Sequence, residues 1–223
     1  MAVPETMPLE GLRPLRYAEA CVKAMRDAVG EDVDIMVDCH ARPSPRMGMR
    51  FAKALEPYRL FFLEDPLAPD QIEWFRRIRQ QSATPIAMGE LHNKPLEWRP
   101  LITEQLIDFI RAHLSQIGGL TPARKLAALC ETFGVRTAWH GPGDTSPVGH
   151  AANLHLDLAC HNFGIQEVIN FSEEIYEVFP GTPELHNGYL WANHKPGLGI
   201  EIDEQAAAKY PISIKPIEWT QSR

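Results

Sequence analysis

The stretch LFFLED, residues 60–65, is a short apolar run that ends in two carboxylates. An apolar run of this length, bounded by polar residues, is typical of a buried strand in a parallel sheet. Similar runs lie on both sides of it, IMVD at 35–38 and PIAMGE at 85–90, and each of them also ends in a carboxylate. One structural unit therefore repeats along this part of the chain.

The repeat continues toward the C-terminus. Further apolar runs are FIRAHLS (109–115), VRTAWH (135–140) and FGIQEV (163–168). Helix-like segments precede or separate the runs, at 15–29, 44–56, 71–81, 95–106, 121–133 and 147–160. Strands that alternate with helices predict βαβ units and a parallel sheet. Six strands about 25 residues apart favour an α/β barrel over an open doubly wound sheet, which stays the alternative.

Two of the expected helices have N-terminal signals. Thr121-Pro122 and Ser146-Pro147 each place a hydroxyl side chain before a proline. A hydroxyl caps backbone N–H groups, and proline suits the first helical position. We therefore expect Thr121 and Ser146 to be N-cap residues. For the domain organisation we expect a loop or linker over 1–14, an incomplete (β/α) barrel over 15–205 and a tail over 206–223.

Composition excludes several classes of function. The 223 residues carry a formal net charge of −7, which disfavours nucleic-acid binding. No apolar run reaches the roughly 18 residues of a membrane span, and no secretory signal pattern opens the sequence. The four cysteines show no CxxC spacing, so we expect free thiols and a cytoplasmic location.

Every expected strand ends in ionisable residues. In chain order these are Asp38 with His40, then Glu64, Glu90, Arg111 with His113, His140 and Glu167. Active sites of parallel α/β barrels lie at the carboxyl ends of the strands. Any single one of these residues is explained equally well as an ordinary polar loop residue. Six strands in succession favour a site.

Three of these carboxylates are evenly spaced. Asp38 and Glu64 are 26 residues apart, and so are Glu64 and Glu90. Carboxylates that gather at one rim repel each other, and a hard divalent cation such as Mg²⁺ relieves the repulsion. No Cys or His lies nearby at zinc-like spacing, which disfavours zinc. Surface carboxylates paired with Arg or Lys are the alternative.

The motifs VDCH, FFLEDP, AMGE, TAWHGPGD and GIQE, in this order, resemble the enolase superfamily. More narrowly they resemble its mannonate dehydratase branch, which includes galactonate-dehydratase-like and starvation-sensing proteins. The resemblance runs from about residue 15 to beyond residue 200. It implies a modified TIM barrel with an N-terminal capping domain, one Mg²⁺ per site, a sugar acid such as mannonate or gluconate as substrate, and a homo-oligomer.

The resemblance also implies roles for individual residues. Asp38, Glu64 and Glu90 match the metal ligands, and His40 matches the general acid that protonates the departing 3-hydroxyl. The product is then a 2-keto-3-deoxy sugar acid. His140 matches a catalytic and substrate-binding histidine, and Arg111, Asp144 and Glu167 match substrate-binding positions. Asp144 has an equal alternative, which is to cap the helix near Ser146.

Measured against that family, the chain lacks the capping domain and the first two barrel strands. The general base, a tyrosine after the second strand, belongs to the missing part. The chain is then a fragment of a longer enzyme or a short protein in its own right. A barrel without two strands exposes unpaired edges. We therefore expect residues 1–223 alone to associate or dissolve poorly and to lack dehydratase activity.

Three functions follow as hypotheses. The first is a Mg²⁺-dependent acid-sugar dehydratase, a hydro-lyase, or part of one. The second is a racemase or epimerase on the same scaffold, which needs bases on both faces of the substrate carbon. The third is a non-catalytic regulatory protein that binds a metal and a sugar acid. Trp219 is a further candidate, as an aromatic side chain that closes over the substrate.

Overall fold

A parallel five-stranded sheet organises the computed structural model, which describes residues 9–211. Its strands follow the chain in the order β1-β2-β3-β4-β5. They are β1 (Met36–Asp38), β2 (Phe62–Glu64), β3 (Ile86–Met88), β4 (Phe109–Ile110) and β5 (Arg136–Thr137). Each adjacent pair is parallel, so all carboxyl ends lie along one edge of the sheet. The α/β barrel architecture expected from the repeat is confirmed as a partial one.

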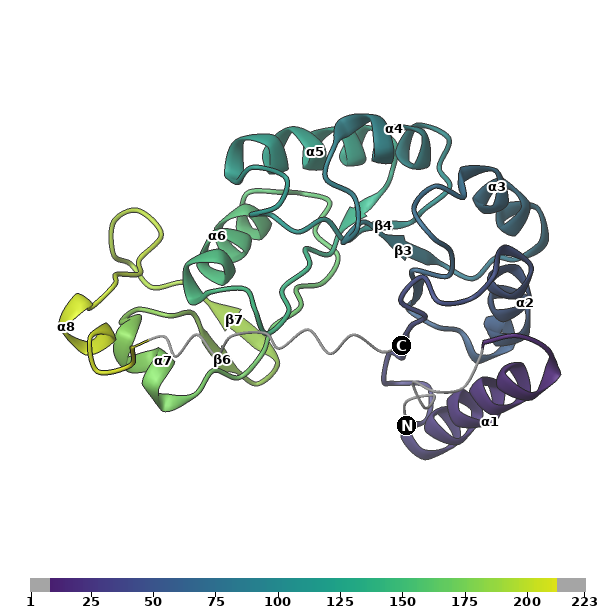
Figure 1. Ribbon diagram of the computed structural model, residues 1–223, viewed down its shortest axis with the longest axis horizontal. Coiled ribbons are helices and arrows are strands. Elements are labelled where there is room, and N and C mark those ends of the chain that lie inside the picture. Colours follow the sequence, from purple (N-terminus) through teal and green to yellow (C-terminus); the bar gives the residue numbers. More distant parts are fainter. Residues whose placement is uncertain (1–8, 212–223) are drawn as a thin grey trace, which may run out of the picture.

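Helices cover the outer side of this sheet. They are α1 (Leu12–Val29), α2 (Pro45–Leu55), α3 (Ile72–Gln81), α4 (Pro95–Thr103), α5 (Leu120–Thr132) and α6 (Pro147–Leu158), with a short 3₁₀ helix η1 (Glu56–Tyr58). Figure 1 shows them along the outside of an open arc, with the strands on the inner side. β2 and β3 are buried along their whole length, which explains why they are apolar except for Glu64 at the end of β2.

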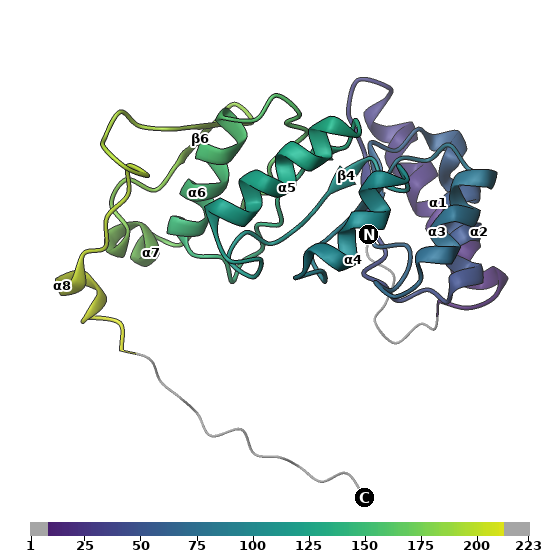
Figure 2. The same ribbon diagram turned by 90° about the horizontal axis from the view of Figure 1, so that it is seen from above.

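A smaller region follows the last helix of the arc. It contains α7 (Glu173–Val178), an antiparallel hairpin of β6 (Glu184–His186) and β7 (Tyr189–Trp191), and α8 (Glu204–Ala207). Figures 1 and 2 place it at the end of the arc away from α1. The alternation of strands and helices did not predict this hairpin, because it lies after the last repeat.

The sixth expected strand is reduced to a single parallel bridge between Thr137 and Phe163. Thr137 N donates to Asn162 O, and Gly164 N donates to Thr137 O, both at 2.9 Å. Ile165 N also donates to Thr137 O, at 3.3 Å, and residues 166–168 are not in a strand. The segment still delivers Glu167 to the carboxyl end of the sheet.

The helix starts agree only in part with the sequence. Ser146 is the N-cap of α6 as expected, and its Oγ accepts from Gly149 N at 3.4 Å. Thr121 is not a cap, because α5 begins at Leu120 after Gly119, whose φ of 93° is open to glycine. α1 begins at Leu12, three residues inside the segment expected as a loop, and Pro14 lies in its first turn.

Within residues 9–211, no helix is both long and apolar enough to cross a membrane. Part of the expected N-terminal loop (1–8), the end of the expected tail (212–223) and Trp219 lie outside the described residues.

Close packing holds α2 against the segment that follows β2. A Cβ on Gly48 would collide with Pro66 O and lie 2.6 Å from Leu67 Cδ2. Gly48 therefore lets the helix approach the backbone beside the carboxylates of the LFFLED stretch.

We expect Gly48→Ala to lower the free energy of unfolding by about 1–3 kcal/mol, because the added methyl overpacks the contact with Pro66. In an exposed helix the same change is normally stabilising. Denaturant unfolding measures the difference. The control is Gly143→Ala, whose Cβ would meet only Ile169 Cδ1, at 3.9 Å. Equal stability of the two variants would contradict the packing argument.

Candidate functional site

The carboxyl ends of the strands carry a dense group of charged side chains. Asp38 ends β1 and Glu64 ends β2, and the two are paired residues in the strand register. Glu90 follows β3 by two residues, and Arg111 comes directly after β4. The parallel topology is thus sufficient to bring together residues that are far apart in sequence.

Arg111 is the buried cation of this group. Its Nε donates to Glu64 Oε1 at 2.6 Å, and one terminal nitrogen donates to Glu167 Oε2 at 2.9 Å. Burial alone would lower the pKa of Arg111, but the two carboxylates outweigh it and raise the pKa. Removing one partner of such a buried pair typically costs about 3–5 kcal/mol, because the other charge is left uncompensated.

Two histidines lie next to the buried carboxylate of Glu90. His140 Nε2 lies 3.0 Å from Glu90 Oε2, and His40 Nδ1 lies 3.2 Å from Glu90 Oε1. The hydrogen bond from His140 outweighs burial and lowers the pKa of Glu90. For His140, burial lowers the pKa, but the bond to Glu90 and the charge of Glu167 raise it overall. Both imidazoles therefore face the carboxylate cluster.

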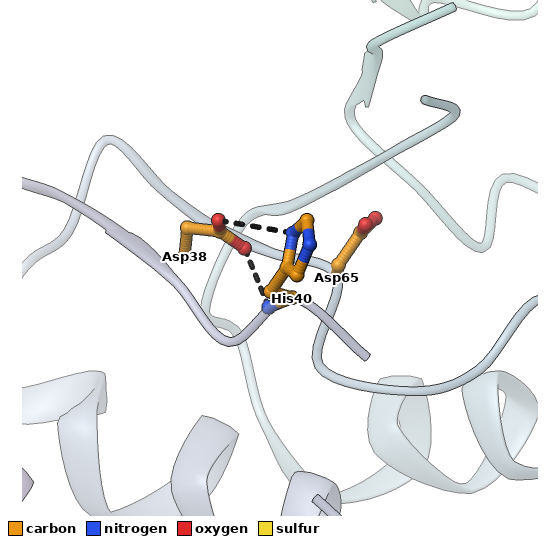
Figure 3. Close-up of side chains that lie close together, drawn as sticks. All are labelled: Asp38, His40 and Asp65. Carbon is orange, nitrogen blue, oxygen red and sulfur yellow. Dashed lines mark hydrogen bonds and ion pairs between the residues drawn. The ribbon is translucent and has the colours of Figure 1, made fainter. Parts of the chain in front are cut away.

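His40 is also tied to the end of β1. Its backbone N donates to Asp38 Oδ1 at 2.6 Å, and its Nδ1 lies 3.6 Å from Asp38 Oδ2. Figure 3 shows the His40 ring between the carboxylates of Asp38 and Asp65. Ligand atoms of these three residues lie within 4.8 Å of one another, close enough to share a metal ion.

Asp65 was not among the candidates from sequence. It is fully buried, and neither of its carboxylate oxygens has a hydrogen-bond partner within the described part of the chain. Burial raises its pKa to about 8, and the charges of Glu90, Glu64 and Asp38 add to the effect. Asp65 is the second carboxylate of LFFLED, but the even spacing of carboxylates along the sequence includes Glu64 alone.

The pKa values of Glu64 and Asp38 are raised in the same direction as that of Asp65. Burial raises the pKa of Glu64 to about 6, against the opposing charge of Arg111. Burial also raises the pKa of Asp38, partly offset by the backbone N–H of His40. The carboxylates at this edge are thus held together at an electrostatic cost, which a bound cation would reduce.

The loop after β5 closes one side of the group. Gly141 N donates to Glu167 Oε2 at 2.8 Å, and His140 Nε2 lies 4.0 Å from the same oxygen. Asp144 is exposed in this loop. It does not cap α6, because Ser146 does, so the capping alternative for Asp144 is wrong.

The chemistry available here follows from the donor types. Several carboxylate oxygens offer a binding site to a hard cation such as Mg²⁺. Arg111 presents a guanidinium that suits carboxylates and hydroxyl oxygens. His40 and His140 carry imidazoles, the side-chain type that most often acts as a general acid or base. Carboxylates that can bind a cation, an anion-binding guanidinium and two imidazoles at one edge suit chemistry on a small carboxylic acid.

Comparison with known proteins agrees with this architecture. Residues 5–206 match the family model described as enolase C-terminal domain-like, and the chain belongs to that family. It is 54% identical over 213 residues to the D-galactonate dehydratase family member RspA of Pantoea ananatis (strain LMG 20103), covering 94% of this chain and 51% of that protein. A D-galactonate dehydratase family member of Enterocloster bolteae is 48% identical over 228 residues, covering 100% of this chain and 56% of that protein.

Solved structures give the same picture. An enolase from Pantoea ananatis, crystallised with D-gluconate and Mg, superposes with a TM-score of 0.87 at 53% identity, over 89% of this chain and 48% of that one. A mandelate racemase/muconate lactonizing enzyme from Jannaschia sp. CCS1 superposes with a TM-score of 0.84 at 29% identity, over 92% of this chain and 52% of that one. The chain spans about half the length of these relatives.

The raised pKa of Asp65 gives the cation-free protein a specific pH dependence. Because the folded-state pKa of about 8 exceeds the ordinary value of 3.8, the stability that the protonated carboxyl provides is present below pH 3.8 and lost as the pH rises through 8. Asp65→Asn should remove this loss. At pH 9 in chelator we expect the variant to be more stable than the parent by about 1–3 kcal/mol.

Urea unfolding of parent and variant between pH 5 and 9 measures this difference. Asp144→Asn, at an exposed carboxylate of the neighbouring loop, is the matched control and should show no such pH-dependent gain. A parent and an Asp65→Asn variant whose stabilities run parallel over the whole range would contradict the assignment.

Proposed function

We propose that this chain provides the cation-binding and sugar-acid-binding part of an acid-sugar dehydratase, a hydro-lyase of the enolase superfamily. The observation that carries the proposal is the cluster of carboxylates at the sheet edge, bonded to Arg111 and to two histidines. The relatives support it, since they include dehydratase family members and a structure with D-gluconate and Mg.

The proposed metal ligands are Asp38, Glu64 and Glu90. All three end or follow strands at the same edge, and the charge of each raises the pKa of the buried Asp65. Their oxygens fit the preference of Mg²⁺. When bound, Mg²⁺ would act as a Lewis acid on the substrate carboxylate and stabilise the charge that develops after proton removal. We therefore propose an enzyme that depends on Mg²⁺ and is located in the cytoplasm.

The remaining roles belong to side chains of this chain. His40, which is exposed and bonded to Glu90, is proposed to protonate the departing 3-hydroxyl as the general acid. Arg111 and Glu167, joined at 2.9 Å, are proposed to bind substrate oxygens together with His140 and Asp144. The product would be a 2-keto-3-deoxy sugar acid, with gluconate or mannonate as the candidate substrate.

The general base is the role for which residues 9–211 offer no matching group. Tyr17 lies in α1, where its hydroxyl is paired with Cys21, and it does not follow a strand. We therefore propose that this polypeptide by itself binds a cation and a sugar acid without turning the acid over. Racemisation stays a second candidate, because His140 faces the carboxylate cluster and racemase-type structures superpose well.

Cation binding is tested by thermal and chemical denaturation with added Mg²⁺. We expect stabilisation by about 2.7 kcal/mol when Mg²⁺ is at roughly 100 times its dissociation constant. Asp38→Asn should abolish the effect, whereas Asp32→Asn, at an exposed acidic residue before β1, should leave it intact. Equal stabilisation of the parent and of Asp38→Asn would rule out Asp38 as a ligand.

The reaction is tested by NMR in D₂O with Mg²⁺ and either D-gluconate or D-mannonate. The chain is assayed alone and after co-purification with the part of the Pantoea ananatis relative RspA that it does not match. We expect a keto-deoxy acid only from the co-purified pair, and none when the chain carries His40→Asn.

Other outcomes are equally informative. Deuterium incorporation into an intact substrate skeleton would replace the dehydratase proposal by racemisation or epimerisation. Binding of the sugar acid by the co-purified pair without any reaction would favour a regulatory protein. A keto-deoxy acid formed by the chain alone would contradict the assignment of the base to another segment.

A further inference from the structure

His113 takes part in none of the proposed chemical steps, yet it is placed between two parts of the site. It lies two residues after Arg111 and is buried. Its Nδ1 is 2.8 Å from Ser115 Oγ, on its own loop, and its Nε2 is 3.0 Å from Thr145 Oγ1, on the loop after β5. One imidazole thus joins the loop that follows β4 to the loop that follows β5.

The bonded residue, Thr145, is the last position of a tight turn. Thr145 N donates to Pro142 O at 2.9 Å, and the side chain is buried. A Cβ on Gly149 would lie 2.7 Å from Thr145 Cγ2, so the first turn of α6 packs closely against this methyl group. Thr145 is therefore held by its hydroxyl on one side and by its methyl on the other.

The opposite end of the same turn is fixed by the site itself. Gly141 N donates to Glu167 Oε2, the oxygen that also accepts from Arg111. A Cβ on Gly141 would lie 2.7 Å from Glu167 O and 2.9 Å from His150 Cε1. Residues 142–144, which include Asp144, project between two anchored ends.

His113 also contacts the catalytic candidate that begins this loop. The rings of His113 and His140 meet edge to face, with centroids 5.6 Å apart. His140 N donates to Ala112 O at 3.2 Å, so the backbone next to His113 supports the same residue. The ring of His140 is therefore bordered by Glu90 on one side and by His113 on the other.

We propose that His113 and Thr145 form a clasp that sets the position of the 141–145 turn, which makes His113 a positioning residue for recognition of the sugar acid. The inference rests on the proposed function only for the identity of the ligand. The turn delivers Asp144 and the Gly141 N–H to the edge where Arg111 and Glu167 lie. Losing the clasp should loosen the turn and weaken ligand binding without changing cation binding.

The test compares two bonds made by one ring. Thr145→Val removes the hydroxyl on the turn at nearly constant volume, and Ser115→Ala removes the hydroxyl on the other nitrogen. His113→Phe removes both bonds, whereas Thr145→Ser keeps the hydroxyl that bonds to His113. Hydrogen exchange of the backbone amides of residues 141 and 143–145 and calorimetric titration with D-gluconate in Mg²⁺ are measured for each variant of the full chain.

For Thr145→Val and His113→Phe we expect exchange of the turn amides to rise, and D-gluconate affinity to fall, by about tenfold, as for one lost hydrogen bond. Ser115→Ala should match the parent, and Thr145→Ser should lie closer to the parent than Thr145→Val does, because it keeps the hydroxyl and loses only the methyl. Mg²⁺ affinity should be the same in all. The double variant His113→Phe/Thr145→Val should be no worse than either single one.

Two results would overturn the clasp. One is unchanged exchange of the turn amides in Thr145→Val. The other is an equal loss in Ser115→Ala, which would indicate general destabilisation around His113. If the parent itself binds no D-gluconate, the proposed function fails, and amide exchange still decides whether the clasp exists.

Discussion

Repulsion between carboxylates at one edge of the sheet is the constraint on which the site depends. Asp38, Glu64, Asp65 and Glu90 influence each other's ionisation because strand ends in a parallel sheet lie next to each other. The structure compensates them unequally: Arg111 pairs with Glu64 and two imidazoles pair with Glu90, whereas Asp65 has no hydrogen-bond partner within residues 9–211. The uncompensated part of the charge is what makes this edge suitable for a cation.

This unequal compensation also explains which parts of the site are rigid. Arg111 is bonded to carboxylates from two segments, so it joins the end of β2 to the segment after α6. Glu167 in turn accepts from Gly141, which carries the constraint into the loop. The charged network and the hydroxyl clasp at Thr145 therefore fix the two ends of the same turn. Charged contacts and neutral hydrogen bonds together determine the shape of one side of the site.

The sequence predicts much of this fold because its periodicity is strong. The buried strand β3 is apolar throughout, β2 is apolar up to its last residue, Glu64, and β2 is followed by the amphipathic helix α3. The sixth run illustrates the limit. Its composition is that of a strand, but within the described residues the ladder ends at the bridge to Thr137, and residues 166–168 are not in a strand. Pairing is a property of the whole sheet, which a local pattern does not contain.

The site was predictable where spacing along the chain determines position in space. Asp38 and Glu64 are paired in register as their equal spacing suggested, although their role as ligands stays a prediction. Asp65 was missed and His113 was given no role, and both omissions have a physical reason. Alternation along an ideal strand points neighbouring side chains to opposite faces, and the left-handed φ of 41° at Asp65 breaks this rule. His113 depends on a hydroxyl 32 residues away, which no local pattern shows.

Left-handed backbone at the ends of β1 and β2 has a consequence for how this site can change over generations. His40, Ala41 and Asp65 have φ between 41° and 52°, a region that Asn, Asp, His and Gly tolerate and β-branched residues avoid. Single-nucleotide changes in the codon for Asp65 include those to Val, Glu, Asn and Gly. The left-handed backbone already discriminates among these residues, whatever chemical role the side chain has. Accepted substitutions at these positions are thus biased toward small polar or flexible residues. The backbone geometry at the ends of β1 and β2, and not only function, limits which amino acids can occupy these positions.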